Sequence, residues 1–180
     1  MTNKRCLVAS LLVTVALAVG ARAFAQETPP TLVSGTFNDY VWVEVGAGAG
    51  AWHVTGSWTA KVNKDSGKGQ FIGSLQGVRS DLWVLQTFAD PANPALRSPH
   101  THHVGLVGAN VTVIPNGIRL EGTATITANG SVAPYSGSRV RVDITGGSLL
   151  RFSNIKLTFF GPAVEHFGPQ PYDGLVVLKR

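Results

Sequence analysis

Apolar and polar residues alternate with a period of two along four stretches of the chain: 52–63, 118–127, 139–144 and 155–159. In the first stretch, the apolar set comprises Trp52, Val54, Gly56, Trp58, Ala60 and Val62. Successive side chains of a strand point to opposite faces of its sheet, so this alternation predicts β-strands with one buried face. Beyond residue 25, no stretch carries a sustained apolar stripe with the 3.6-residue period of a helix.

Residues that tolerate a positive φ angle separate these stretches, at 65–69, 115–117, 129–130 and 146–147. Short turns between alternating stretches predict an all-β fold, an antiparallel meander that closes as a β-barrel, with a β-sandwich as the alternative. Small residues on the apolar faces favour the curved sheet of a barrel over the sandwich. They are Gly56, Ala60, Gly73, Gly122 and Ala124.

The first 25 residues have the pattern of a secretory signal peptide. Lys4 and Arg5 precede an apolar run over residues 6–20, and Ala23 and Ala25 supply the small-x-small cleavage pattern, so that Gln26 begins the mature chain. Cleavage after Ala23 fits nearly as well. The apolar run is shorter than the ~20 residues that span a bilayer. We therefore expect a secreted or periplasmic protein without a membrane span in the mature chain, with residues 26–180 forming a single domain.

Removal of residues 1–25 changes both the cysteine count and the net charge of the chain. Cys6 is the only cysteine, so the mature chain has no disulfide and no catalytic thiol. The formal net charge of +5 includes Lys4, Arg5 and Arg22, without which twelve Lys and Arg face ten Asp and Glu. A net charge of +2 does not indicate a nucleic-acid partner.

The most unusual motif is the tetrapeptide His100-Thr101-His102-His103. In an extended segment, His100 and His102 point to one face and His103 to the other. Two imidazoles at this spacing can chelate one divalent transition metal ion such as zinc, copper or iron. The alternative is that these histidines cap a strand and stay solvated.

A metal site needs at least one further ligand, for which His53 and His166, the latter next to Glu165, are the candidates. A metal-binding cupin is excluded, because its glutamate would fall at Leu106 or Val107 and its third histidine at Leu120.

Other catalytic signatures are absent from the sequence. No Gly-x-Ser-x-Gly motif occurs, and the carboxylates are distributed over separate predicted strands, so no acid/base pair can be assigned. We expect Glu121 and Asp143 to pair across neighbouring strands with Arg119, Arg139 or Arg141.

Two further features could form a binding site. The four tryptophans Trp42, Trp52, Trp58 and Trp83 could line a small-molecule cavity, although Trp52 and Trp58 share one apolar face and are expected in the core. Residues 88–101 contain three prolines without periodicity and lead into the histidine-rich tetrapeptide, as functional loops often do.

Two blocks carry a resemblance to known proteins. They are His100-Thr101-His102-His103, and Phe152-Ser153-Asn154-Ile155-Lys156-Leu157-Thr158-Phe159 followed by His166-Phe167-Gly168-Pro169-Gln170-Pro171. In this combination the chain resembles a group of small secreted bacterial proteins of unknown function, which implies a bacterial source and one compact domain but no activity. In architecture, the strand pattern resembles the barrel of allene oxide cyclases and dirigent proteins, none of whose functional residues can be placed in this chain.

Three functions fit these patterns. The first is an exported β-barrel that binds a small apolar or amphipathic ligand. The second is a metal-dependent enzyme that uses His100 and His102, with His53 or His166 completing the site. The third is a structural or surface domain without a pocket. The sequence does not indicate an oligomeric state.

Overall fold

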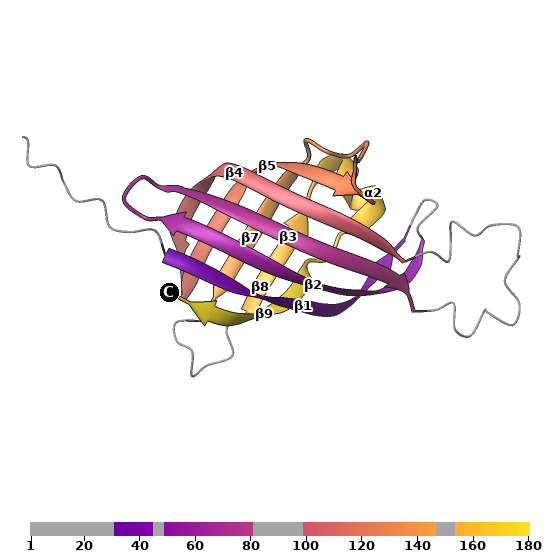
Figure 1. Ribbon diagram of the computed structural model, residues 1–180, viewed down its shortest axis with the longest axis horizontal. Coiled ribbons are helices and arrows are strands. Elements are labelled where there is room, and N and C mark those ends of the chain that lie inside the picture. The colour runs from indigo at the N-terminus through magenta and orange to yellow at the C-terminus, as the bar shows by residue number, and fades with distance from the viewer. Residues whose placement is uncertain (1–30, 45–48, 81–98, 147–153) are drawn as a thin grey trace, which may run out of the picture.

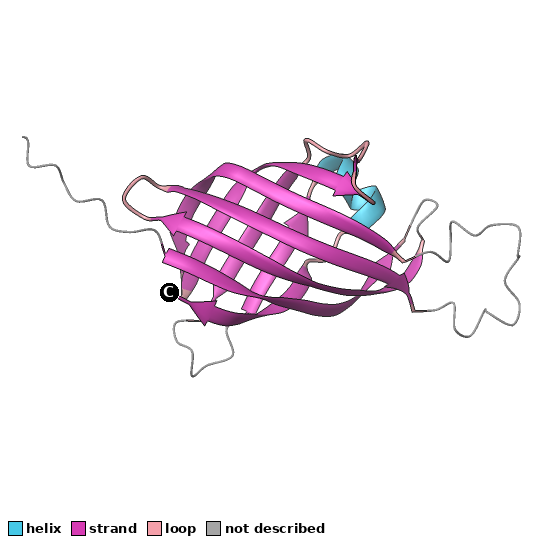
Figure 2. Cartoon of the chain, viewed as in Figure 1, coloured by secondary structure: helices cyan, strands magenta, loops and turns pink. Residues whose placement is uncertain are grey.

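Strands wind around a common axis in the computed structural model, which describes residues 31–44, 49–80, 99–146 and 154–180 (Figure 1). In chain order they are β1 (Thr31–Val43), β2 (Gly50–Asn63), β3 (Lys68–Arg79), β4 (His100–Ile114), β5 (Gly117–Ala128), β6 (Ser131–Val132), β7 (Arg139–Thr145), β8 (Asn154–Phe159) and β9 (Tyr172–Lys179). The 3-10 turn η2 (Gly161–Ala163) and the helix α2 (Val164–Phe167) lie between β8 and β9 (Figure 2). Within the described ranges, no helix is long and apolar enough to cross a membrane.

Every pairing in the sheet is antiparallel. The strands follow one another in the order β4-β3-β2-β1-β9-β8-β7-β5, and β4 also pairs with β5, which closes an eight-stranded barrel. The short strand β6 pairs with the end of β5. The predicted all-β meander is confirmed, and the closed ring of pairings selects the barrel over the sandwich.

The barrel interior is filled by the apolar faces that the alternation predicts. Trp52 and Trp58 on β2 are buried, with 8% and 2% of their surface exposed, which confirms their expected place in the core. The largest fully buried side chains are Trp58, Phe37, Phe71, Phe159, Phe167, Leu75, Leu106 and Leu120. These residues belong to one continuous apolar cluster. Aromatic and leucine side chains therefore occupy most of the space that a wider barrel would leave for a ligand.

Small residues permit the curvature of the wall. A Cβ atom on Gly56 would lie 2.1 Å from the carbonyl oxygen of Ser74 on the neighbouring strand, so only glycine allows β2 and β3 to approach this closely. The register of β4 against β5 shifts between Leu106 and Asn110, and Gly108 lies within this bulge with a φ of 67°. Bulges of this kind bend a strand and increase its twist, as barrel closure requires.

Tight turns occur where the sequence predicts them. Asn116, with a φ of 62°, connects β4 to β5, and Asn129 and Gly130, with φ angles of 48° and 84°, connect β5 to β6. Asn63 stabilises the turn between β2 and β3, because its Oδ1 accepts hydrogen bonds from the N–H groups of Asp65 and Ser66, each at 3.0 Å.

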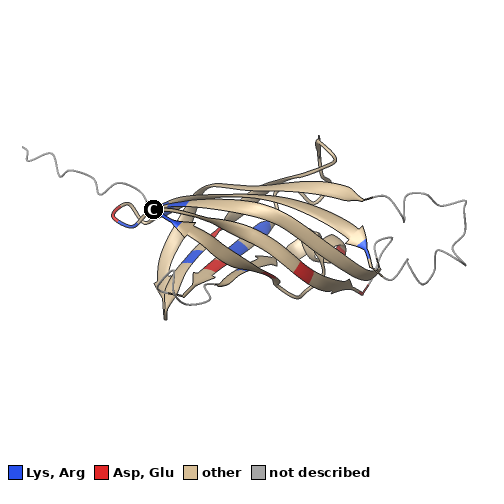
Figure 3. Cartoon of the chain, turned by 60° about the horizontal axis from the view of Figure 1, so that its bottom comes forward, with Lys and Arg blue, Asp and Glu red and all other residues tan. Residues whose placement is uncertain are grey.

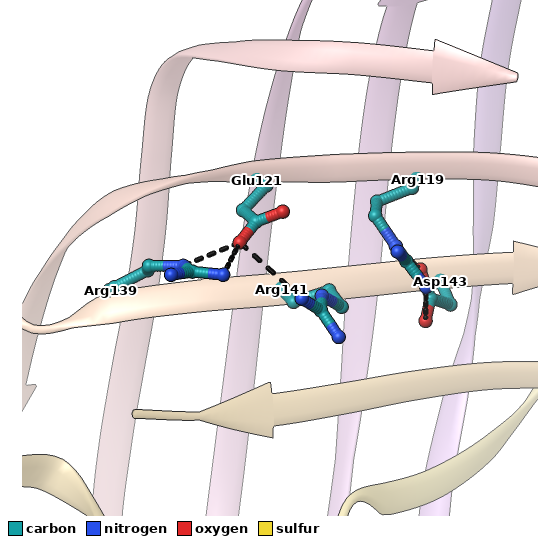
Figure 4. Close-up of polar contacts among 5 residues, drawn as sticks. All are labelled: Arg119, Glu121, Arg139, Arg141 and Asp143. Carbon is teal, nitrogen blue, oxygen red and sulfur yellow. Dashed lines mark hydrogen bonds and ion pairs between the residues drawn. The ribbon is translucent and has the colours of Figure 1, made fainter. Parts of the chain in front are cut away.

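Acidic and basic residues are interspersed along the wall of the barrel (Figure 3). On β5 and β7, Arg119 donates to Asp143 at 2.6 Å, and Glu121 pairs with Arg139 and, at 3.6 Å, with Arg141 (Figure 4). The predicted cross-strand ion pairs are thus confirmed. They neutralise one another across the ladder and leave neither carboxylate free as a catalytic base.

Candidate metal centre

Strand β4 directs two histidines into the barrel. His100 lies opposite Gly77 of β3, and His102 lies opposite Leu75 of β3 and Ala128 of β5. His102 is buried, with 3% of its surface exposed, whereas His103 between the inward positions is exposed. The expectation that His100 and His102 share one face is therefore confirmed, and that face is the interior.

Helix α2 supplies a third histidine at the same end of the barrel, beside the arrowhead of β5 (Figure 1). The helix is anchored by Phe167, whose ring stacks on Phe159 of β8 with 3.9 Å between centroids and 7° between planes. Gly168, with a φ of 82°, ends the helix and donates its N–H to the carbonyl of Val164 at 2.8 Å. This anchoring holds His166 over the two histidines of β4.

His100, His102 and His166, hereafter the histidine cluster, present nitrogen atoms that all lie within 4.8 Å of one another. The Nε2 atoms of His102 and His166 are 3.0 Å apart. Two nitrogens bound to one tetrahedral zinc ion at about 2.0–2.1 Å are about 3.3 Å apart. The pair already has this spacing within a few tenths of an ångström, and a nitrogen of the half-buried His100 lies within 4.8 Å of both.

Hydrogen bonding fixes which nitrogen of His102 carries its proton. Its Nδ1 lies 3.1 Å from the carbonyl oxygen of Thr127, an acceptor only, so Nδ1 is the donor. In the neutral ring, Nε2 then carries a lone pair that faces His166 and accepts a hydrogen bond from its Nε2–H at 3.0 Å. A backbone carbonyl bound to the second ring nitrogen is the usual support of a metal-ligating histidine.

The surroundings also keep two of the imidazoles neutral. Burial, followed by the neighbouring His166 and His100, lowers the pKa of His102 to about 3. Burial, followed by His100, lowers the pKa of His166 to about 4. Neutral imidazole is the form that binds metals, so at neutral pH neither ring has to lose its net charge first. Nε2 of His166 becomes a ligand once its proton moves to Nδ1 of the same ring, which leaves the ring neutral.

Aromatic rings enclose the histidine cluster. Trp52 contacts His100 edge-on with 4.8 Å between centroids, and Tyr135 stacks on His166 at 4.6 Å and 19°. The hydroxyl oxygen of Tyr135 lies 3.4 Å from Nδ1 of His102. Sequence reasoning missed Tyr135, because it lies in the irregular segment between β6 and β7 and carries no periodic signal.

A small cavity of about 20 Å³ borders the histidine cluster. Its lining consists of Val43, Trp52, Val54, Leu75, Gly77, His100, His102, His166, Phe167 and Tyr172. One water molecule needs about 10–15 Å³ by a comparable measure, so the cavity has room for an ion or one to two small molecules. Drug-sized ligands occupy pockets of about 300–1,000 Å³.

The structure does not bring His53 to this site. His53 lies on the outer face of β2, where its Nε2 lies 2.7 Å from Oδ1 of Asn38 and its ring stacks on Tyr40 with 4.5 Å between centroids. Its place as a candidate third ligand was therefore wrong, because the alternation that buries Trp52 and Val54 directs His53 outward. The candidate third ligand is instead His166, whose neighbour Glu165 is exposed.

Two other predicted features, the four tryptophans and the irregular stretch 88–101, each contribute one described residue to the cavity lining, Trp52 and His100. Trp42 is on the outer face with 55% of its surface exposed, and Trp83 lies outside the described residues. Most of the irregular stretch 88–101 also lies outside them, but its last two residues, His100 and Thr101, belong to β4. The histidine-rich tetrapeptide is thus part of the wall of the barrel.

The role of the histidine cluster has to be derived from its own chemistry. Its described members offer three nitrogen ligands, a supported tautomer at His102 and an adjoining space for a fourth ligand. Comparisons of the chain with protein-family models, with curated proteins and with solved structures find no match.

Proposed function

We propose that the protein is an exported β-barrel that binds a first-row transition metal ion through Nε2 of His102 and Nε2 of His166, together with His100. The observation that carries this proposal is the 3.0 Å separation of the two Nε2 atoms, one of which has a lone pair directed at the other. Three histidines with an open fourth position are the ligand set of catalytic zinc sites, and copper and iron accept the same ligands.

The choice among metals follows from ligand type. Imidazole suits zinc, copper, nickel and iron, whereas magnesium and calcium require oxygen ligands. The histidine cluster contains no carboxylate. Copper binds nitrogen sites more tightly than zinc in the usual order of affinities, so we expect Cu²⁺ to bind most tightly and Mg²⁺ not at all.

Metal titration of the purified, untagged protein tests the proposal. Wild type should bind one equivalent of Zn²⁺ or Cu²⁺, measured by calorimetry and by metal analysis after dialysis. His166→Ala and His100→Ala should each weaken binding by at least tenfold, since each removes a ligand. The matched controls are His53→Gln and His103→Gln on the outer face, which should bind as wild type does. Equal affinity of wild type and His166→Ala would contradict the proposal.

Export is the second part of the proposal. It is supported by the basic and apolar residues of 1–25 and by the Ala23-Phe24-Ala25 cleavage pattern. The mass of the protein recovered outside the cytoplasm of its host measures the cleavage point, which should leave Gln26 as the first residue. Recovery of the uncleaved chain from the cytoplasm would contradict this part.

Metal-dependent catalysis and binding of a small apolar ligand stay predictions. The size of the cavity at the histidine cluster limits both, because its volume of about 20 Å³ is far below that of a typical small-molecule pocket. A substrate of this site would therefore consist of a few atoms, or would enter only after α2 moves away from the barrel.

A further inference from the structure

The metal site proposed above is incomplete in its ligands. The histidine cluster offers three nitrogen atoms, and a zinc or copper ion takes at least one more ligand. The hydroxyl of Tyr135 lies beside Nδ1 of His102, across the ring from the Nε2 atom that faces His166. The hydroxyl of Tyr172, which also lines the cavity, donates to the carbonyl oxygen of Phe167 at 3.0 Å. The described side chains therefore leave the fourth position to a molecule from solution.

The charge of the metal ion restricts which molecule can be its fourth ligand. Three neutral imidazoles leave the full +2 charge of the ion uncompensated, and the cavity beside them is lined mainly by apolar side chains. A net charge in apolar surroundings has a high free energy unless an opposite charge is bound to it. Glu165, next to His166 in the chain, is exposed rather than part of the histidine cluster. A monovalent anion as fourth ligand would halve the buried charge.

The volume of the cavity restricts the size of the fourth ligand. A cavity of about 20 Å³ admits hydroxide, a halide or one end of a linear anion, but no tetrahedral oxyanion. The space exists because Gly77, opposite His100, has no side chain. A Cβ atom there would lie 3.4 Å from Cε3 of Trp52 and 3.6 Å from Nε2 of His100.

Gly77 is not required by the backbone. Its φ angle is not among the positive ones, and the contacts of an added Cβ are ordinary van der Waals distances. An alanine would therefore fit the fold, but its methyl group would lie beside the ligand nitrogen of His100. The residue that leaves this space open for a fourth ligand is thus a glycine that the fold itself does not need.

We propose that the metal ion of the histidine cluster takes a small monovalent anion as its fourth ligand, hydroxide in plain water and azide when supplied, in the space left open by Gly77. This inference rests on the proposed metal binding. The site would select anions by size and charge, accepting linear or monatomic monovalent anions and excluding phosphate.

Azide titration of the copper-loaded protein tests this inference. Wild type loaded with one equivalent of Cu²⁺ should develop an azide-to-copper charge-transfer band that saturates, and phosphate should neither produce a comparable change nor compete. Gly77→Ala should keep the Cu²⁺ stoichiometry but bind azide at least tenfold more weakly. The matched control is Gly122→Ala, in which the added Cβ lies 3.5 Å from Cα of Ala109 and away from the histidine cluster.

The outcomes separate the two proposals. Copper binding without a response to azide, or equal competition by phosphate, would overturn the anion site and leave metal binding intact. Failure of wild type to bind Cu²⁺ would overturn both. Circular dichroism checks that Gly77→Ala is folded, and the comparison of azide with phosphate on wild type decides the question without any variant.

Discussion

Mild acid should destabilise the metal-free protein through His102. The imidazole has a pKa of about 3 in the folded chain and 6.5 in the unfolded chain. Below pH 6.5 the unfolded state therefore binds more protons than the folded state, and stability falls as the pH falls. Burial, followed by the neighbouring His166, His100 and His103, opposes protonation of His102, and the carbonyl of Thr127 favours it.

The size of this loss follows from proton linkage. Each pH unit between the two pKa values changes the free energy of unfolding by about 1.4 kcal/mol, so His102 contributes a loss of roughly 2 kcal/mol between pH 7.5 and pH 5. His166, with a pKa lowered to about 4, acts in the same direction. Its contribution is smaller than its pKa implies, because the side chain is only half-buried and solvent screens its charge. The total loss is roughly 2–4 kcal/mol.

Urea unfolding at pH 7.5 and pH 5.0 in the presence of a chelator measures this loss. His102→Leu removes the buried imidazole. Between pH 7.5 and pH 5.0, the free energy of unfolding of this variant should therefore fall by about 2 kcal/mol less than that of wild type. His53→Gln on the outer face should keep the wild-type dependence. An equal loss of stability in His102→Leu and in wild type would refute the reasoning.

Four further substitutions test the fold and the support of the site. Gly56→Ala should destabilise the barrel by more than 2 kcal/mol in urea unfolding, because its Cβ would lie 2.1 Å from the carbonyl oxygen of Ser74; Gly122→Ala, with ordinary contacts at 3.5 Å, should cost less than 1 kcal/mol. Phe167→Ala should cost about 3–5 kcal/mol and weaken metal binding in calorimetry, since the ring anchors α2; unchanged metal affinity would show that α2 does not need this anchor. Glu121→Ala should change the free energy of unfolding by less than about 1 kcal/mol, because its ion pairs lie on the outer face; a larger loss would contradict their assignment as weak surface pairs.

The period-two alternation predicted four strands of the wall, β2, β5, β7 and β8. Trp52 and Trp58 are buried as expected, and the ion pairs of Glu121 and Asp143 join the predicted strands. These features depend on local geometry, because strand periodicity alone decides which face a side chain occupies. The same rule correctly placed His100 and His102 together.

The remainder of the site depends on contacts between distant segments. His166 lies on a four-residue helix, and its position depends on the stacking of Phe167 on Phe159. Tyr135 reaches the histidine cluster from an irregular segment. No local pattern encodes such placements, so His53 and His166 were equal candidates from sequence. The structure distinguishes them, because His53 lies on the outer face of the barrel and His166 contacts the inward-facing His102.

The pairing of β1 with β9 gives the barrel a seam with consequences for folding. The backbones of Leu32 and Arg180 exchange two hydrogen bonds, at 2.9 and 2.8 Å, across this seam. The other pairings of the ring join strands that are close in sequence, so the seam closes the longest loop and should form last. Until then, two unpaired strand edges are open to other chains. The yield of refolding should therefore fall as protein concentration rises, even though the ring of pairings among the described strands is closed in the finished barrel.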